Sequence, residues 1–284
     1  MFRYSAFGVT IESSIEFPGA WGNAPSAAAP DVVVGLSDAA ERTDGASRSL
    51  SWSGVGKLVA TDGRRLTIHP AAGAEPSALS VAAAGAGLGM LLEQRGFLVL
   101  HGSCVQIGAG AACFVGASGV GKSSVASALV GRGHRLVSDA MTVVSFDSHG
   151  ATAHFGPPQL KLWPDALKRL SAPLGVETVF DSEKLLCAVQ AASTEGTVRL
   201  ERIYSLAASE VVTIGNALRP AEAVMQLMRN VYLADYLDAS SAPILLQRCV
   251  HAVEATRSFR ADRGSTPSDL EHFVALLEHD AQAR

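Results

Sequence analysis

The sequence predicts an α/β (α+β) fold in which a small β-rich unit precedes a larger core. The first third of the chain carries short strand-like runs separated by turn residues. The middle alternates apolar runs with one helical segment, and a glycine-rich loop joins the run at 111–115 to the helix at 122–131. In folds of this class, ligands bind where such loops leave the carboxyl ends of strands.

The N-terminal unit is expected to span residues 1–78 and to be built from strands and turns. Asp62-Gly63 is a strong turn signal and predicts a hairpin between the apolar runs on either side of it. Small or polar residues at 18–30 and 37–48 are typical of connectors. The predicted strands are 4–13, 32–36, 56–60 and 65–69.

The remaining residues, 79–284, are expected to form the core with a helical C-terminal part. A helix at 79–94 ends at Gly96, and the glycines at 131 and 133 stop the helix that follows the glycine-rich loop. The predicted strands around that helix are 97–106, 111–115, 134–138 and 141–146.

Beyond residue 156 the pattern predicts mostly helices. The last of them begins with Thr266 as N-cap, Pro267 at the first position and Asp269 in the first turn. The predicted helices are 163–170, 181–191, 220–237 and 267–281, with strand-like stretches at 198–207 and 209–214.

Composition excludes several classes of protein. The 284 residues carry a formal net charge of −4, so no basic excess favours binding of nucleic acid or of an anionic membrane. The apolar stretch 78–92 is shorter than a membrane span, and no secretory signal is recognised, which predicts a cytoplasmic protein. The four cysteines lack metal-site spacing and are interpreted as buried thiols.

Residues 116–123 match the phosphate-loop pattern GxxxxGK[ST]. In such a loop the glycines let backbone N–H groups point at phosphate oxygens, the lysine reaches the β and γ phosphates, and the next hydroxyl binds Mg²⁺. Lys122 and Ser123 would take those last two roles, and the start of the helix would add a favourable dipole. The nucleotide-binding residues are therefore expected to be Gly116, Ala117, Ser118, Gly119, Val120, Gly121, Lys122, Ser123 and Ser124.

Asp139 follows the apolar strand of Leu136 and Val137, so its carboxylate should emerge at the same sheet edge as the loop. There it could hold Mg²⁺ or accept the proton of an attacking hydroxyl; the alternative is an ordinary turn aspartate at a strand end. Basic residues could close over phosphate or substrate, although each is also compatible with a solvated surface position. Those considered are Arg229, Arg202 and Lys161 first, then Lys184, Arg199 and Arg257.

Three motifs together resemble the catalytic core of HPr kinase/phosphorylase: Leu100-His101-Gly102-Ser103, the phosphate loop, and 133–139 with the sequence GHRLVSD. The resemblance implies a P-loop kinase fold shared with phosphoenolpyruvate carboxykinase, with Asp139 as the catalytic base and His101 beside it. From composition alone, His101 would more often be a buried histidine at a strand end, and the resemblance reverses that preference. For His134, a packed helix-to-strand turn remains the preferred interpretation.

The chain departs from that family in two ways. Ala140 stands where the family has a second aspartate, and the later glutamate-containing signature is not found, which argues against phosphorylase activity. The segments 6–13 and 156–165 instead resemble smaller HPr-kinase-like proteins, some of which phosphorylate a serine at the carboxyl end of lasso peptide precursors.

The sequence thus predicts an ATP- and Mg²⁺-dependent kinase acting on a serine of a peptide or small protein. Lys122, Asp139 and His101 would form its catalytic group, with Ser123 and Asp139 at the metal. Two alternatives stay open: an NTP-binding regulatory or assembly module without transfer, and a kinase of a small-molecule hydroxyl. The resembled enzymes are hexamers, but the N-terminal part differs from theirs, so homo-oligomerisation is left open.

Overall fold

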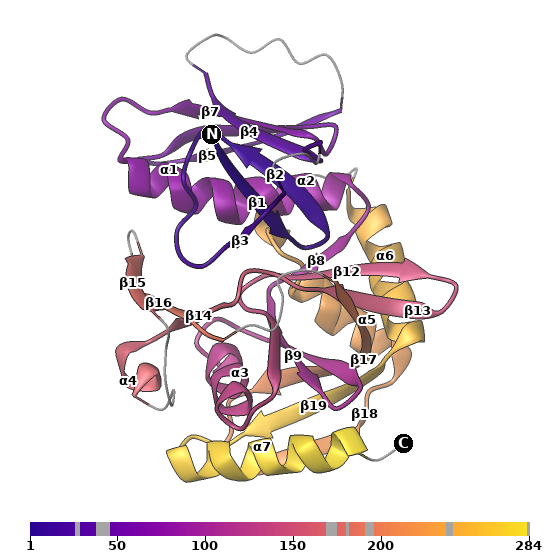
Figure 1. Cartoon of the computed structure of the whole chain (residues 1–284). Helices are drawn as coiled ribbons and strands as arrows, with labels where there is room; N and C mark the ends of the chain where they lie inside the picture. The colour runs from indigo at the N-terminus through magenta and orange to yellow at the C-terminus, as the bar shows by residue number, and fades with distance from the viewer. Residues whose placement is uncertain are drawn as a thin grey trace.

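A computed structural model describes residues 1–25, 29–37, 46–168, 175–179, 182–190, 196–236 and 241–282. It confirms the predicted α/β class, and its two main sheets lie one above the other (Figure 1). A long helix lies between the two sheets.

The first sheet has seven strands in the order β3-β1-β2-β4-β7-β6-β5. At the predicted hairpin, Asp62 and Gly63 both have positive φ, as a tight turn requires, and β6 pairs with β7 across it. The predicted strand at 32–36 is confirmed, whereas the single run at 4–13 is two strands. The strands are β1 (Phe2–Ala6), β2 (Val9–Ser13), β3 (Gly22–Asn23), β4 (Val32–Leu36), β5 (Ser47–Trp52), β6 (Gly56–Thr61) and β7 (Arg65–Pro70).

The long helix beneath this sheet combines α1 (Pro76–Ala82), the π-helical turn η1 (Ala83–Gly87) and α2 (Leu88–Gln94). By length and mean hydropathy of 1.2 it could cross a membrane, but 78% of its most apolar window is buried inside the fold. A side chain at Gly87 would collide with Leu66 of β7, so the glycine lets sheet and helix approach closely. The apolar character of this helix therefore serves the core of the first sheet.

The second sheet follows the path β11-β9-β10-β17-β13-β12-β8, and β19 joins β17 to β18. Helices cover both of its faces, so β10 is buried throughout: Phe114 packs with α3 and α7, and Cys113 packs with α5 and α6. Its strands are β8 (Leu98–Leu100), β9 (Gly102–Ile107), β10 (Gly110–Val115), β11 (Arg135–Ser138), β12 (Thr142–Asp147), β13 (Gly150–His154), β17 (Thr197–Ala207), β18 (Val212–Ala217) and β19 (Arg257–Arg263).

The helices of the core are α3 (Lys122–Gly131), α4 (Pro164–Leu167), α5 (Pro220–Arg229), η2 (Ala234–Tyr236), α6 (Ala242–Ala255) and α7 (Pro267–Gln282). The predicted bounds of α3 are confirmed. So is the start of α7, where the Thr266 hydroxyl accepts from the Asp269 N–H and the Asp269 carboxylate accepts from the Thr266 N–H. All four cysteines are buried free thiols, as predicted.

The C-terminal part is less helical than predicted. The helix expected at 181–191 is wrong: Ser182–Ala188 is β16, which lies between β14 (Gln159–Leu162) and β15 (Gly175–Val179) in a third sheet. Residues 189–190 follow this strand, while 180–181 and 191 lie outside the described residues. Pairing with two partner strands decided the conformation, because short apolar runs have no clear period of their own. Helix α6 was not predicted.

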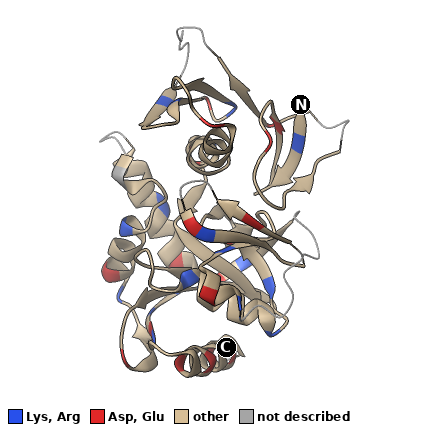
Figure 2. Cartoon of the chain, turned by 90° about the vertical axis from the view of Figure 1, so that its left-hand side faces the viewer, with Lys and Arg blue, Asp and Glu red and all other residues tan. Residues whose placement is uncertain are grey.

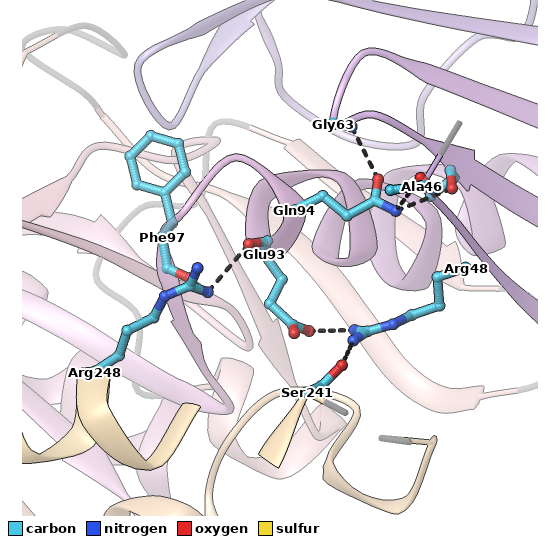
Figure 3. Close-up of polar contacts among 9 residues, drawn as sticks. Ala46, Arg48, Gly63, Glu93, Gln94, Phe97, Ser241 and Arg248 are labelled. Atoms are coloured by element: carbon cyan, nitrogen blue, oxygen red, sulfur yellow. Dashed lines mark hydrogen bonds and ion pairs between the residues drawn. The ribbon is translucent and has the colours of Figure 1, made fainter. Parts of the chain in front are cut away.

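Charged residues of both signs are interspersed over the described chain, and few of them lie in the first sheet (Figure 2). Polar contacts nevertheless join the first sheet to the long helix and to the core. Arg48 of β5 lies 2.5 Å from the Glu93 carboxylate of α2, and Arg248 of α6 donates to the backbone oxygens of Glu93 and Phe97 (Figure 3). This buried cluster joins the first sheet, the long helix and the core.

Glu93→Ala is expected to lower the free energy of unfolding by about 3 kcal/mol, because it leaves the half-buried Arg48 guanidinium without its carboxylate. Urea unfolding followed by circular dichroism measures the change. The matched control is Glu222→Ala, which removes a highly exposed pair with Arg219 and should change stability by less than about 1 kcal/mol. Equal effects of the two substitutions would contradict the role given to the buried cluster.

Candidate active site

The predicted phosphate loop connects β10 to α3 and takes a conformation that depends on glycine. Gly116, Gly119 and Gly121 have φ of 143°, 81° and 104°, values that residues with a side chain rarely adopt. A side chain at Gly116 would also meet the backbone oxygen of Leu206. The loop residues Ala117, Ser118 and Gly119 are exposed, so the curled backbone is open to a ligand at the start of α3.

Lys122 is buried and folds back across this loop. Its ammonium donates to the backbone oxygens of Gly116 at 2.7 Å and Ala117 at 3.0 Å. Burial lowers the pKa of Lys122, and the Asp139 carboxylate partly opposes that shift. A desolvated ammonium with only carbonyl partners is suited to receive phosphate oxygens.

Asp139 lies at the end of β11 and accepts three hydrogen bonds from three other elements. Its Oδ1 accepts from the hydroxyl of Ser103 in β9 at 2.5 Å and from the hydroxyl of Ser123 in α3 at 3.0 Å. Its Oδ2 accepts from the backbone N–H of Lys161 in β14 at 2.7 Å. The carboxylate is thus held beside the phosphate loop, where strand position alone predicted it.

Ala140, the next residue, has φ of 63°. Left-handed backbone at alanine is unfavourable and is kept only where the surroundings enforce it, commonly at functional sites. The turn directs the chain from β11 into β12 directly after the aspartate. It also places a methyl group where a second carboxylate would otherwise stand.

A cavity of about 730 Å³ lies over the loop, and we call it the phosphate cavity. Four cationic side chains line it, from α3, β14, β16 and β19: Lys122, Lys161, Lys184 and Arg263. The Arg263 Nε–H also donates to the backbone oxygen of Val120 in the loop. Such a concentration of positive charge around backbone N–H groups suits a polyphosphate. Ser118, Gly119, Gly121, Ser123 and Ser124 complete the loop side of the cavity.

His101 also lines the phosphate cavity, and its ring stacks on Tyr232 with centroids 6.2 Å apart. Burial lowers the pKa of His101 to about 4, helped by the positive charges of Lys122, Lys184 and Lys161. The imidazole is therefore neutral at physiological pH. It can orient a neighbouring group by hydrogen bonding, but it does not bring a positive charge to the cavity.

The basic residues favoured by the sequence are not all at this site. Lys161 lines the cavity, whereas Arg229 is exposed at the end of α5 and does not line it. Arg202 is buried in β17, where it pairs with Asp280 near the end of α7 at 3.1 Å, and Tyr204 donates to the same carboxylate. Its guanidinium therefore anchors the C-terminal helix.

Several site residues were not identified from the sequence. Asn230, next to Arg229, accepts from the Gly116 N–H through its side chain and from the His101 N–H through its backbone oxygen. Tyr232 belongs to none of the motifs in the sequence, and Ser103 belongs to the motif 100–103 without a predicted role. No sequence motif indicated Arg263. It lies near the phosphate loop because β19 pairs with β17, which in turn pairs with β10.

Proton titration of His101 by NMR should give a pKa near 4 in the wild-type protein, and Lys184→Ala should raise it, because one repelling charge is removed. The pKa rises because removing a neighbouring positive charge makes the protonated imidazole less unfavourable. Histidine Cε1–H resonances followed between pH 3.5 and 8 measure both values.

The control for this titration is Lys57→Ala, which removes an exposed lysine of β6 that does not line the cavity. It should leave the His101 resonance unchanged. A wild-type His101 titrating near pH 6.5 would show that the ring is neither desolvated nor close to the lysines.

Part of the core is similar to a known protein family. Residues 96–160 match the family described as HPr Serine kinase C-terminal domain. A solved structure of the Hpr(Ser) kinase/phosphatase from Coxiella burnetii matches at 11% identity with a TM-score of 0.33, covering 65% of this chain and 99% of that chain. No curated protein matches the chain. Over residues 96–160, which contain the loop and Asp139, the family match confirms the predicted resemblance to HPr serine kinases and the predicted enzyme class, an HPr-kinase-like phosphotransferase.

Proposed function

We propose that this protein transfers the γ-phosphoryl group of ATP to a serine hydroxyl of a peptide or small protein. The observation that carries the proposal is the 3.0 Å contact between the Asp139 carboxylate and the Ser123 hydroxyl of the phosphate loop. It supports the proposal because the carboxylate that would accept the proton lies beside the loop that would hold the phosphates. Phosphoryl transfer requires little more from a protein than positioning and charge stabilisation.

Lys122 and the loop N–H groups would hold the β and γ phosphates. The serine Oγ would attack the γ phosphorus while its proton passes to Asp139, and the bond from phosphorus to the bridging oxygen would break, leaving its electron pair on ADP. The hydrogen bonds from Ser103 and the Lys161 N–H fix the carboxylate for this role. Lys161, Lys184 and Arg263 lie where they can stabilise the transferring charge.

The same pair of oxygens fits a magnesium ion. Two ligands at adjacent corners of an octahedron with bonds of about 2.1 Å lie about 3 Å apart, which matches the distance between Ser123 Oγ and Asp139 Oδ1. The described residues contain no cluster of three His, Cys, Asp or Glu side chains, so phosphate oxygens and water would complete the coordination. When bound, the ion would neutralise charge on the β and γ phosphates.

The direction of phosphoryl transfer and the class of acceptor are proposed from the positions at which this sequence differs from the HPr kinase pattern. Ala140 stands in place of a second aspartate directly after Asp139, which supports the forward kinase reaction. The segments 6–13 and 156–165 favour a peptide acceptor, with the C-terminal serine of a lasso peptide precursor as the specific candidate, in the cytoplasm. We also propose that the chain is divided into a β-rich unit at 1–78 and a kinase core at 79–284.

Asp139→Asn is expected to reduce phosphoryl transfer by about 10²- to 10⁴-fold, because the amide cannot accept the serine proton, while nucleotide affinity is largely kept. Lys122→Ala should lose nucleotide binding itself. Phosphopeptide formation and titration with a fluorescent ATP analogue separate the two effects. Asp147→Asn, an exposed aspartate at the end of β12, is the matched control; undiminished transfer by Asp139→Asn would overturn the assignment.

Ser103→Ala is expected to lower kcat roughly tenfold with little change in nucleotide affinity, because Asp139 loses a hydrogen bond that orients it. Steady-state kinetics with varied ATP measure this. Ser127→Ala is the control, since Ser127 is a buried serine of α3 whose hydroxyl has no hydrogen-bond partner among the described residues. Equal losses in both variants would indicate a general effect of altering buried serines.

A further inference from the structure

A second cavity, of about 310 Å³, adjoins the phosphate cavity. We call it the acceptor cleft; residues of the first sheet, of the long helix and of the core line it. Asp139 lines this cleft and not the phosphate cavity. The two cavities meet at residues that line both: Ala140, Lys161, Tyr232, Leu233 and Tyr236.

The walls of the acceptor cleft are mostly apolar and aromatic. The first sheet and its loops contribute Phe7, Trp21 and Trp52, and the long helix contributes small residues such as Ala84. Trp52 is 45% exposed, so it stands at the rim, whereas Phe7 is 2% exposed and forms the inner wall. Exposed tryptophan beside a cavity next to the reaction centre is typical of a binding surface.

Close contacts between the two units hold these walls in place. The Phe7 N–H donates to the Phe155 backbone oxygen at 2.7 Å, and a side chain at Gly156 would overlap the Phe7 ring. The Ala20 N–H donates to the Gln159 side chain at 2.6 Å. On the other side of the unit, the Arg48–Glu93 cluster fixes the sheet to the helix and to α6 (Figure 3). The cleft is therefore preformed.

We propose that the acceptor cleft binds a bulky apolar side chain of the substrate peptide, next to the serine that is phosphorylated. This inference rests on the proposed kinase function. In phosphoryl transfer the attacking oxygen and the leaving oxygen lie in line on opposite sides of the phosphorus. With ATP at the phosphate loop, the acceptor hydroxyl must reach the γ phosphorus from the side opposite ADP and within reach of Asp139. The acceptor cleft, unlike the phosphate cavity, is lined by Asp139.

The residues that line the acceptor cleft determine which class of peptide side chain can bind there. The charged groups of the cleft, Asp139 and Lys161, belong to the end shared with the reaction centre. Elsewhere the described lining offers only Ser51 and Gln159 as polar side chains, and the Gln159 oxygen already accepts from Ala20. A charged side chain would lose its hydration there without an ionic partner, whereas an aromatic or branched aliphatic one would gain by burial.

The test uses synthetic hexapeptides that contain one serine, with Phe, Leu, Gly, Asp or Lys on either side of it. Peptides with Phe or Leu should be phosphorylated with the highest kcat/KM. Ala84→Phe, which fills the cleft, should raise the peptide KM of the Phe peptide roughly tenfold or more and leave the KM of ATP unchanged. Trp52→Ala, at the exposed rim, provides a second variant that does not disturb the core.

The matched control is Ile244→Ala, an apolar residue of α6 that is 52% exposed and lines neither cavity. This control substitution should leave kcat, the peptide KM and the KM of ATP unchanged. A preference for charged flanking residues, or none, would overturn the inference while leaving the kinase function intact. A raised KM for ATP in Ala84→Phe would also overturn it, because the cleft would then hold the nucleotide base.

A second readout separates the inference from the kinase function. Peptides with Ala in place of the serine cannot react, and their binding is followed by the fluorescence of Trp21 and Trp52. One outcome is that no serine peptide is phosphorylated, although the Phe peptide binds the wild-type protein and does not bind Ala84→Phe. That outcome supports the acceptor cleft as a peptide site and contradicts the kinase proposal. If no peptide binds in either assay, the cleft is not a peptide site.

Discussion

The candidate active site depends on the position of the Asp139 carboxylate. It accepts hydrogen bonds from β9, from the first turn of α3 and from the backbone of β14, so one side chain joins three segments that are distant in sequence. Because the donors come from different elements, the carboxylate has little freedom to turn away from the loop. Preorganisation of this kind is what phosphoryl transfer demands of a protein.

Two further contacts connect this centre to the rest of the molecule. Asn230 bonds both to the loop at Gly116 and to the backbone of His101, and Tyr232 stacks on the His101 ring. Tyr232 in turn lies against the long helix, where a side chain at Gly89 would collide with its ring and one at Gly85 would be in tight contact with its hydroxyl. Helix, tyrosine, histidine and phosphate loop thus form one continuous set of contacts.

The N-terminal unit completes the site. Its first hairpin packs on Gly156, its next loop binds Gln159, and its tryptophans form the outer wall of the acceptor cleft. Segments 6–13 and 156–165 are therefore in contact with one another, and together they line the approach to Asp139.

By itself, the sequence determined the local features: the phosphate loop, the bounds of α3, the Asp-Gly hairpin, the cap of α7 and the position of Asp139 at a strand end. These follow from spacing and from residues such as glycine, proline and threonine, whose conformational preferences act over a few positions. Only the tertiary structure decided that 182–188 is a strand, that Arg202 pairs with Asp280 while Arg263 reaches the loop, and that Ser103 holds Asp139. Those outcomes depend on pairing between strands far apart in the chain, and such long-range pairing leaves no periodic signal in the sequence.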